Sequence, residues 1–185
     1  MRTFMAIDLE PEIKKRLLLL LENLKKLSQN IRWVSREGMH LTLKFLGEIN
    51  PEKVRPVEGV LKDISEQYHP FPLRFKGTGW FPPGKKNPRV FWVGVETEPS
   101  LFSLQSQLEK SLEKLGFPKE ERDFHPHLTL GRVKMPSGLQ QTLSELEKQK
   151  ETLFGEMTVC KVTFYQSVLK PSGAEYKVLS EFELK

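Results

Sequence analysis

The sequence predicts a single α+β domain of two similar halves, with two mainly antiparallel sheets facing a central cleft and helices on the outside. A chain of 185 residues suits one globular unit. Strand and helix patterns follow one another in the same order in both halves, and the middle strand of each half carries the same motif. No apolar run approaches the roughly 20 residues that a bilayer span requires, so we expect no membrane association.

Each half reads strand, helix, strand, helix, strand. Apolar runs or alternation predict the strands, and apolar residues at helical spacing predict the helices. The segments expected in the first half are strands 4–8, 40–46 and 73–77 and helices 10–29 and 51–67. Those expected in the second half are strands 89–95, 127–133 and 157–169, helices 100–115 and 137–150, and a last strand over 174–184. We therefore expect one domain over 1–185, with lobes built mainly from about 1–80 and 89–170.

The middle strands of the two halves share a short motif. Residues 40–43 and 127–130 both read His-Leu-Thr-Leu, at the same place in the order of elements. Because side chains alternate along a strand, His40 and Thr42 share one face, and the two leucines share the other, core-facing side with Phe45. The second copy divides in the same way. Two polar faces meeting across a cleft would bring together two imidazoles and two hydroxyls.

These groups suit phosphodiester chemistry without a metal or a covalent intermediate. Histidine alone has an unperturbed pKa of about 6.5, so one neutral and one protonated imidazole, from His40 and His127, can take and give protons in one reaction. Thr42 and Thr129 can donate to the phosphate oxygens, where negative charge must be held. We expect no cofactor and no metal.

A zinc site is the competing interpretation. Asp123, His125 and His127 stand close together in the sequence, and His40 could join them. A proline between the two neighbouring histidines disturbs regular strand geometry, and the chain has no Cys pair and no His-Glu-x-x-His helix. The metal-free interpretation is therefore favoured. His125 and His69, each beside a proline, are expected at the surface.

The overall composition says less about function. A formal charge of +5 and a pI near 9.2 favour polyanionic partners without requiring them. The single cysteine, Cys160, lies in an apolar run and is expected to be an inert core thiol. The first eight residues lack the pattern of a secretory signal, so we expect the protein in the cytoplasm.

At its two motifs the sequence resembles the two-histidine phosphoesterase superfamily, which is defined by paired HxTx motifs. The residues that flank the motifs resemble one branch specifically, the 2′-5′ RNA ligases, also called RNA 2′,3′-cyclic phosphodiesterases. The segments that carry this resemblance are 1–8, 31–34, 40–47, 80–82, 88–94, 124–132, 165–169 and 173–176. Nearly the whole chain is covered. Gly131 departs from the pattern, since alanine is more common there.

The resemblance implies a bilobal fold and hydrolysis of RNA 2′,3′-cyclic phosphate ends to 2′-phosphates. Some members also join RNA ends through a 2′,5′ linkage without ATP. His127 would activate water and His40 would protonate the departing 3′ oxygen, or the reverse, while Thr42 and Thr129 hold the phosphate. The implied partners are RNAs with 2′,3′-cyclic phosphate and 5′-hydroxyl ends, tRNA halves among them. We expect a monomer.

Four basic residues are further candidates for RNA contacts. Arg132 matches the arginine that commonly follows the second motif, and its guanidinium suits a phosphate or a base; a surface salt bridge is the alternative. Lys44 shares the expected strand face of His40 and could reach RNA phosphates, or it is an exposed lysine without a partner. Lys85 and Lys86, near two aromatic residues, could guide single-stranded RNA, or they belong to a solvated loop.

Two other functions stay open on the sequence alone. One is an RNA- or nucleotide-binding module that keeps the fold without turnover; the presence of both histidines argues against it. The other is a phosphodiesterase acting on a different diester, such as 2′-5′-linked oligoadenylate or a small cyclic-phosphate metabolite. Assays on defined substrates separate that possibility from RNA ends.

Overall fold

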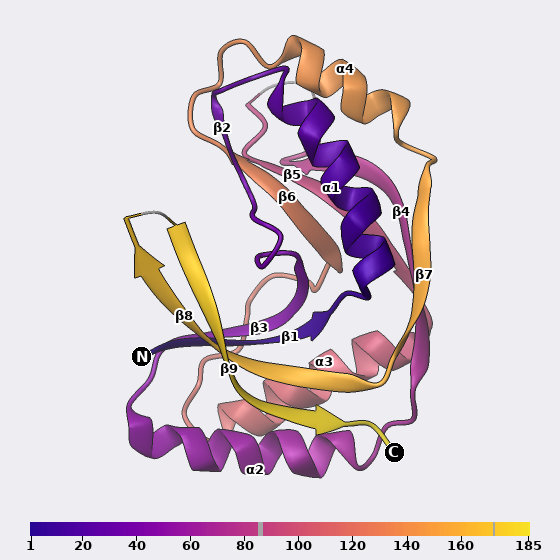
Figure 1. Cartoon of the computed structure of the whole chain (residues 1–185). Helices are drawn as coiled ribbons and strands as arrows, with labels where there is room; N and C mark the ends of the chain where they lie inside the picture. The colour runs from indigo at the N-terminus through magenta and orange to yellow at the C-terminus, as the bar shows by residue number, and fades with distance from the viewer. Residues whose placement is uncertain (85–86, 172) are drawn as a thin grey trace.

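The computed structural model describes residues 1–84, 87–171 and 173–185. Two antiparallel sheets form the centre of the molecule (Figure 1). The strands are β1 (Arg2–Asp8), β2 (Ile31–Trp33), β3 (His40–Glu48), β4 (Phe71–Phe81), β5 (Val90–Thr97), β6 (His127–Val133), β7 (Leu153–Val159), β8 (Lys161–Lys170) and β9 (Gly173–Glu183). The helices are α1 (Pro11–Lys25), α2 (Val54–Ser65), α3 (Pro99–Glu113) and α4 (Gln140–Lys148), with the 3-10 turn η1 (Pro51–Lys53) before α2.

Each sheet takes strands from both halves of the chain. The four-stranded sheet has the order β3-β1-β8-β9, and the five-stranded sheet has the order β2-β6-β5-β4-β7. The expected α+β fold with two antiparallel sheets is confirmed. The sheets do not coincide with the expected lobes of about 1–80 and 89–170, because β4 and β8 each pair with a strand of the other half. Two strands pair when their edges lie side by side in the folded chain, and the order of the strands in the sequence does not decide which edges do so.

The helices cover the outer faces of the sheets. Helices α2 and α3 pack on each other and against the four-stranded sheet, whereas α1 contacts β7 and α4 contacts β4 in the five-stranded sheet. Buried leucine and isoleucine side chains recur every three or four residues along α1, which is the spacing of one helix face. No helix in the described part of the chain is long and apolar enough to span a bilayer.

The strand expected over 157–169 is two strands in two different sheets. Strand β7 ends at Val159 and pairs with β4, and β8 begins at Lys161 and pairs with β1. The chain passes from one sheet to the other at Cys160, whose side chain is exposed. The prediction of a buried core thiol is therefore wrong, because a residue at the crossing between sheets has neither sheet to pack on.

Both motif strands carry a β-bulge directly after the His-x-Thr pair. A single step along β1 corresponds to two residues of β3, and the extra residue is Leu43. In the same way, a single step along β5 corresponds to two residues of β6, and the extra residue is Leu130. A bulge reverses the alternation of faces beyond it. The first six residues of β3 and of β6 therefore follow the same order of burial, ending in two adjacent buried residues and then an exposed one. The exposed residues are Phe45 and Arg132, so the expectation that Phe45 lies in the core is wrong.

Gly131 has a structural reason to be glycine. A Cβ atom at this position would lie 2.7 Å from the Trp33 ring and 2.8 Å from the side chain of Ile31. Both residues belong to β2, which pairs with β6 at this point. The departure from the more common alanine therefore accompanies the close approach of β2 to the second motif strand.

Candidate active site

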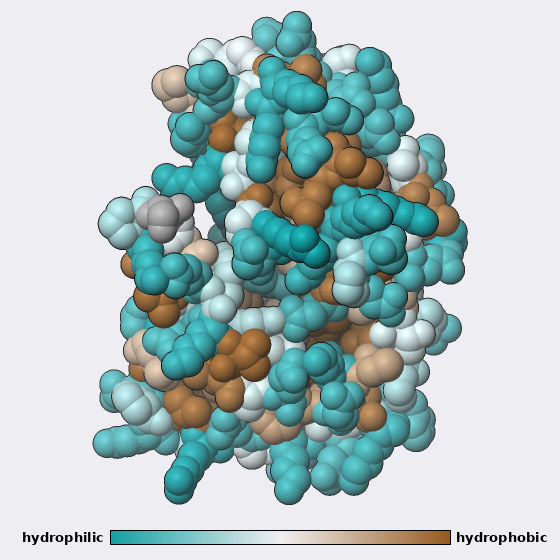
Figure 2. All heavy atoms as spheres, viewed as in Figure 1, coloured by the Kyte–Doolittle hydropathy of each residue, from teal (hydrophilic) through white to brown (hydrophobic). Residues whose placement is uncertain are grey.

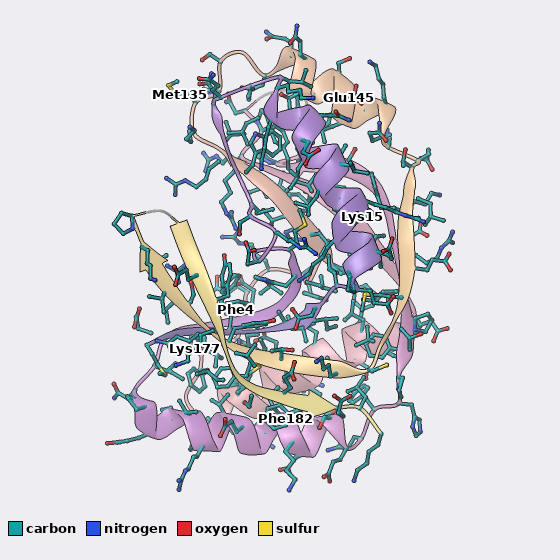
Figure 3. All side chains as sticks on the ribbon, in the orientation of Figure 1. Phe4, Lys15, Met135, Glu145, Lys177 and Phe182 are labelled. Atoms are coloured by element: carbon teal, nitrogen blue, oxygen red, sulfur yellow. The ribbon has the colours of Figure 1, made fainter. Side chains whose placement is uncertain are left out.

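His40 lies at the start of β3, directly opposite Asp8 of β1. Its ring stacks on Phe4 at 4.7 Å between centroids, lies 5.9 Å from Tyr165, and meets the edge of Tyr176 at 5.2 Å. Phe4 is labelled in Figure 3, near the point where β1, β8 and β9 cross in this view. Burial among these rings lowers the pKa of His40 to about 4, although the charge of Asp8 acts to raise it. In the free protein this imidazole is therefore neutral at pH 7.

Asp8 is held in place by two hydroxyl groups from β8. The Tyr165 hydroxyl donates to the Asp8 carboxylate at 2.5 Å, and the Thr163 hydroxyl donates to its other oxygen at 2.8 Å. Burial and the hydrogen bond to Asp8 raise the pKa of Tyr165, so the phenol stays protonated and remains a donor. Sequence reasoning missed this group. The signal that could have found it is an acidic residue ending the otherwise apolar first strand.

His127 lies at the start of β6 and has a different environment. Its Nδ1 is 2.7 Å from the backbone carbonyl oxygen of His125, so Nδ1–H donates to that carbonyl and Nε2 is left for the site. The edge of Phe81 meets the ring at 5.2 Å. Burial lowers the pKa of His127, and the positive charge of Arg132 lowers it further.

Contacts and charge interactions link the surroundings of the two motifs. Strands β3 and β6 contact each other, although they belong to different sheets. Tyr176 touches His40, and the charge of Arg132 acts on Tyr176 as well as on His127. Figure 2 shows a hollow at the left edge of the molecule, between the end of the β8–β9 hairpin and the upper half of the view.

Both predicted threonines are partly accessible, as a hydroxyl that is to contact the substrate must be. Thr42 and Thr129 are half-buried, as the two histidines are, whereas the leucines between each pair are buried. Thr42 and Thr129 each stand two residues after their histidine, on the same strand face. Each motif strand therefore carries one half-buried imidazole and one half-buried hydroxyl on a common face.

Lys44 does not belong to this site. Its ammonium lies 2.5 Å from the Glu109 carboxylate and donates to the Pro118 carbonyl at 2.9 Å, and both charged side chains are buried. The bulge at Leu43 turns Lys44 to the opposite side of the sheet from His40, toward α3. The prediction that Lys44 reaches RNA phosphates is therefore wrong.

The other predicted positions divide as follows. Lys85 and Lys86 lie outside the described residues. His69 and His125 are exposed, as expected from their neighbouring prolines. Within residues 1–84, 87–171 and 173–185, no three His, Cys, Asp or Glu side chains are grouped so that they could hold a metal ion, and Asp123, His125 and His127 are no exception.

A comparison with protein families matches the chain twice. The model of the LigT like phosphoesterases covers residues 7–92 and again residues 93–176. The chain belongs to the LigT like phosphoesterase family. Each of the two matched segments holds one His-x-Thr motif, so the internal repeat inferred from the sequence is a repeat of the family's own unit.

Several relatives of this LigT like phosphoesterase carry the name RNA 2′,3′-cyclic phosphodiesterase. The one from Methanothermobacter thermautotrophicus is 34% identical over 99% of this chain and 98% of its own length. The one from Thermotoga maritima is 38% identical over 100% of this chain and 96% of its own length. The match thus extends over whole chains on both sides.

Solved structures share the fold over its full extent. A crystal structure of a protein from Thermus thermophilus matches with a TM-score of 0.85 and 30% identity, covering 100% of this chain and 98% of the other. The crystal structure of E. coli LigT complexed with 3′-AMP matches with a TM-score of 0.79 and 26% identity, covering 99% and 97%.

Proposed function

We propose that this LigT like phosphoesterase hydrolyses the 2′,3′-cyclic phosphate ends of RNA to 2′-phosphates, with His40 and His127 as its proton-transfer pair. The observation that carries the proposal is the repeated geometry, in which two strands with the same order of burial each present a His-x-Thr face. Relatives named RNA 2′,3′-cyclic phosphodiesterase, at 34% and 38% identity over nearly their whole length, support the same activity.

The reaction is a displacement at phosphorus. His127 takes a proton from water through Nε2 as the water oxygen forms a bond to phosphorus. The bond from phosphorus to the 3′ oxygen breaks, and His40 gives that oxygen a proton, which leaves a 2′-phosphate and a 3′-hydroxyl. The hydroxyls of Thr42 and Thr129 donate to the non-bridging oxygens as charge builds on them. A general acid or base contributes typically about 10²–10⁴ in rate.

The surroundings of the two histidines favour this division of roles. Asp8 stands opposite His40, and its negative charge favours the protonated imidazole that an acid needs. Gly94 occupies the matching place opposite His127, so no carboxylate stands there. The positive charge of Arg132 favours the neutral imidazole that a base needs.

Binding of the substrate raises the pKa of His40, which then takes up its proton from the solvent. Burial alone keeps His40 neutral near pH 7 in the free protein. A cyclic phosphate diester brings a negative charge next to this imidazole, and an opposite charge within about 4–6 Å favours the charged form. The Arg132 guanidinium, exposed beside His127, is suited to hold the same phosphate. The site thus protonates its acid only when the substrate is present.

The same arrangement can also join two RNA ends. A 5′-hydroxyl oxygen that replaces water as the nucleophile, and loses its proton to His127, gives a 2′,5′ linkage when the 3′ oxygen departs. RNAs with 2′,3′-cyclic phosphate and 5′-hydroxyl ends, including tRNA halves, are therefore the partners we propose. We also propose that the protein acts as a monomer in the cytoplasm and that it needs no metal.

The test is single-turnover cleavage of a short RNA with a 2′,3′-cyclic phosphate end, in EDTA, with the position of the product phosphate mapped. The native protein is compared with His40→Ala, His127→Ala and the control His69→Ala, which removes an exposed histidine outside the site. We expect a 2′-phosphate from the native protein and the control, and a loss of at least about 10²-fold in both motif variants.

Each alternative gives a different result in this assay. No product from well-folded native protein would favour a binding module or another diester, which nucleotide-binding and 2′-5′ oligoadenylate assays then separate. Activity that disappears in EDTA and returns with zinc would show that the reaction depends on a metal. A 3′-phosphate product would mean that the 2′ oxygen departs, and it would contradict the proposed protonation of the 3′ oxygen by His40.

A further inference from the structure

A buried ion pair joins the first motif strand to helix α3, which packs against β3 (Figure 1). The ammonium of Lys44 on β3 lies 2.5 Å from the carboxylate of Glu109 on α3, and each residue is 6% exposed. Two more groups donate to that carboxylate, the side-chain amide of Gln105 at 3.1 Å and the backbone N–H of Glu120 at 3.2 Å. The reaction proposed above uses none of these groups.

The Lys44–Glu109 pair also holds the connection between α3 and the second motif strand, residues 114–126. The ammonium of the pair donates to the backbone carbonyl of Pro118 at 2.9 Å, and the carboxylate accepts the backbone N–H of Glu120. Because both partners in the connection are backbone groups, the pair fixes the path of the main chain there. The connection therefore reaches β6 from a place that is set by β3 and α3.

The last residues of this connection orient His127. The ring of Phe124 meets the ring of Phe102, on α3, edge-on at 6.1 Å. The next residue, His125, supplies the carbonyl oxygen that lies 2.7 Å from Nδ1 of His127. That bond selects the tautomer in which Nε2 is free to act as the base. The position of the main chain at His125 thus decides which nitrogen of His127 faces the substrate.

The physical chemistry of a buried ion pair favours a role in placement over a role in stability. Removing two charges from water costs free energy that their mutual attraction offsets only in part, so apolar side chains of similar volume are often equally stable. The pair does select one arrangement, because either charge is unfavourable in the core without the other. Here that arrangement sets the chain that precedes His127 against the strand that carries His40.

We propose that the Lys44–Glu109 pair positions His127 relative to His40, by fixing the connection between α3 and β6 on the strand of the first motif. This inference rests on the proposed function. Neither side chain of the pair touches the substrate, and both act through the main chain. Acid and base must stand on opposite sides of phosphorus, and a misplacement of about 1 Å can slow a reaction by about 10²-fold. The pair is therefore a positioning device that joins the two halves of the site.

The test uses the double variant Lys44→Met with Glu109→Leu, since each single change leaves one charge buried without its partner. We expect urea unfolding to show a folded protein of near-native stability. Its kcat on a short RNA with a 2′,3′-cyclic phosphate end should fall by about 10- to 100-fold, with KM nearly unchanged because the pair makes no contact with the substrate. The control Leu24→Ala, which shortens a fully buried side chain of α1, should lower stability and leave kcat as in the native protein.

A second comparison leaves the buried pair intact and changes only exposed positions of the connection. Glu120→Pro removes the N–H that Glu109 accepts. Glu121→Pro is the matched control, because the N–H at that position makes no hydrogen bond within the described part of the chain. We expect Glu120→Pro alone to lower kcat, by a smaller factor than the double variant. Equal kcat values for the two proline variants would overturn the role of Glu109.

Nitrogen-15 NMR of the imidazoles measures the placement of His127 without catalysis. We expect the Nδ1–H tautomer of His127 in the native protein and a mixture of tautomers in the double variant, with unchanged signals from His40. If the native protein hydrolyses no cyclic phosphate, the proposed function fails, and the tautomer alone decides the positioning. If the double variant does not fold, the two proline variants decide it. A folded double variant with native kcat, or with the native tautomer of His127, would overturn the inference.

Discussion

The half-buried imidazole of His40, stacked among aromatic rings, makes the stability of the protein depend on pH in a way that can be calculated. The pKa of His40 is about 4 in the folded chain and about 6.5 in an unfolded one. Because the folded value is the lower one, the unfolded chain takes up this proton at a higher pH than the folded chain. The contribution of His40 to stability is therefore complete above about pH 6.5 and is lost as the pH falls to about 4.

The size of this effect follows from the gap between the two pKa values. A gap of roughly 2.5 corresponds to about 3 kcal/mol, at about 1.4 kcal/mol for each pKa unit. His40→Phe isolates it, since phenylalanine keeps a ring against Phe4 and Tyr165 but cannot titrate. Carboxylates that do not interact with His40 become protonated alike in both proteins, so their contribution cancels in the comparison.

The assay is urea unfolding at pH 7.5 and at pH 4. We expect the free energy of unfolding of the native protein to fall by about 3 kcal/mol more than that of His40→Phe. His69→Gln, which replaces an exposed imidazole, should behave as the native protein. A difference below about 1 kcal/mol, or an NMR titration of His40 with a midpoint at or above pH 6.5, would show that the imidazole is solvated and would refute the reasoning.

Three further predictions concern single side chains. Lys44→Met should lower the free energy of unfolding by about 3–5 kcal/mol, because it leaves the buried charge of Glu109 without a counter-charge; urea unfolding measures this, and a stable variant with weaker RNA binding would show that Lys44 contacts RNA. Thr42→Val and Thr129→Val should each slow single-turnover cleavage by about 10²–10³-fold with a smaller loss of stability, and variants that unfold in proportion to their lost activity would make the hydroxyls structural. Asp8→Asn should lower the NMR titration midpoint of His40 and the rate of cleavage together, whereas an unchanged midpoint would remove Asp8 from the mechanism.

Local sequence was sufficient for the elements that are long and regular. The motif strand expected over 127–133 has the observed bounds, and every helix end lies within about four residues of its expected position. Strand β2 was missed because three residues carry too little periodicity, and its place is decided by pairing with β6. The single strand expected over 157–169 looked continuous because an apolar pattern does not reveal a change of sheet.

Pairing between distant strands decided which side chains reach the site. The bulges at Leu43 and Leu130 arise from the register of β3 against β1 and of β6 against β5, which no local pattern contains. They turn Lys44 into the core and bring Phe45 and Arg132 to the surface. Alternation counted along the sequence gives the opposite result for Lys44 and Phe45.

The sequence by itself determined the repeated His-x-Thr strands, the α+β class and the resemblance to a phosphoesterase family, because identity and two-residue alternation are local properties. The tertiary structure alone decided that Asp8 stands beside His40 and that burial holds the pKa of His40 near 4. It also decided that the ring of Tyr176 meets that of His40 and that the charge of Arg132 acts on both Tyr176 and His127. Solvent exclusion and the approach of charges depend on segments far apart in the chain, so they exist only once both sheets have formed.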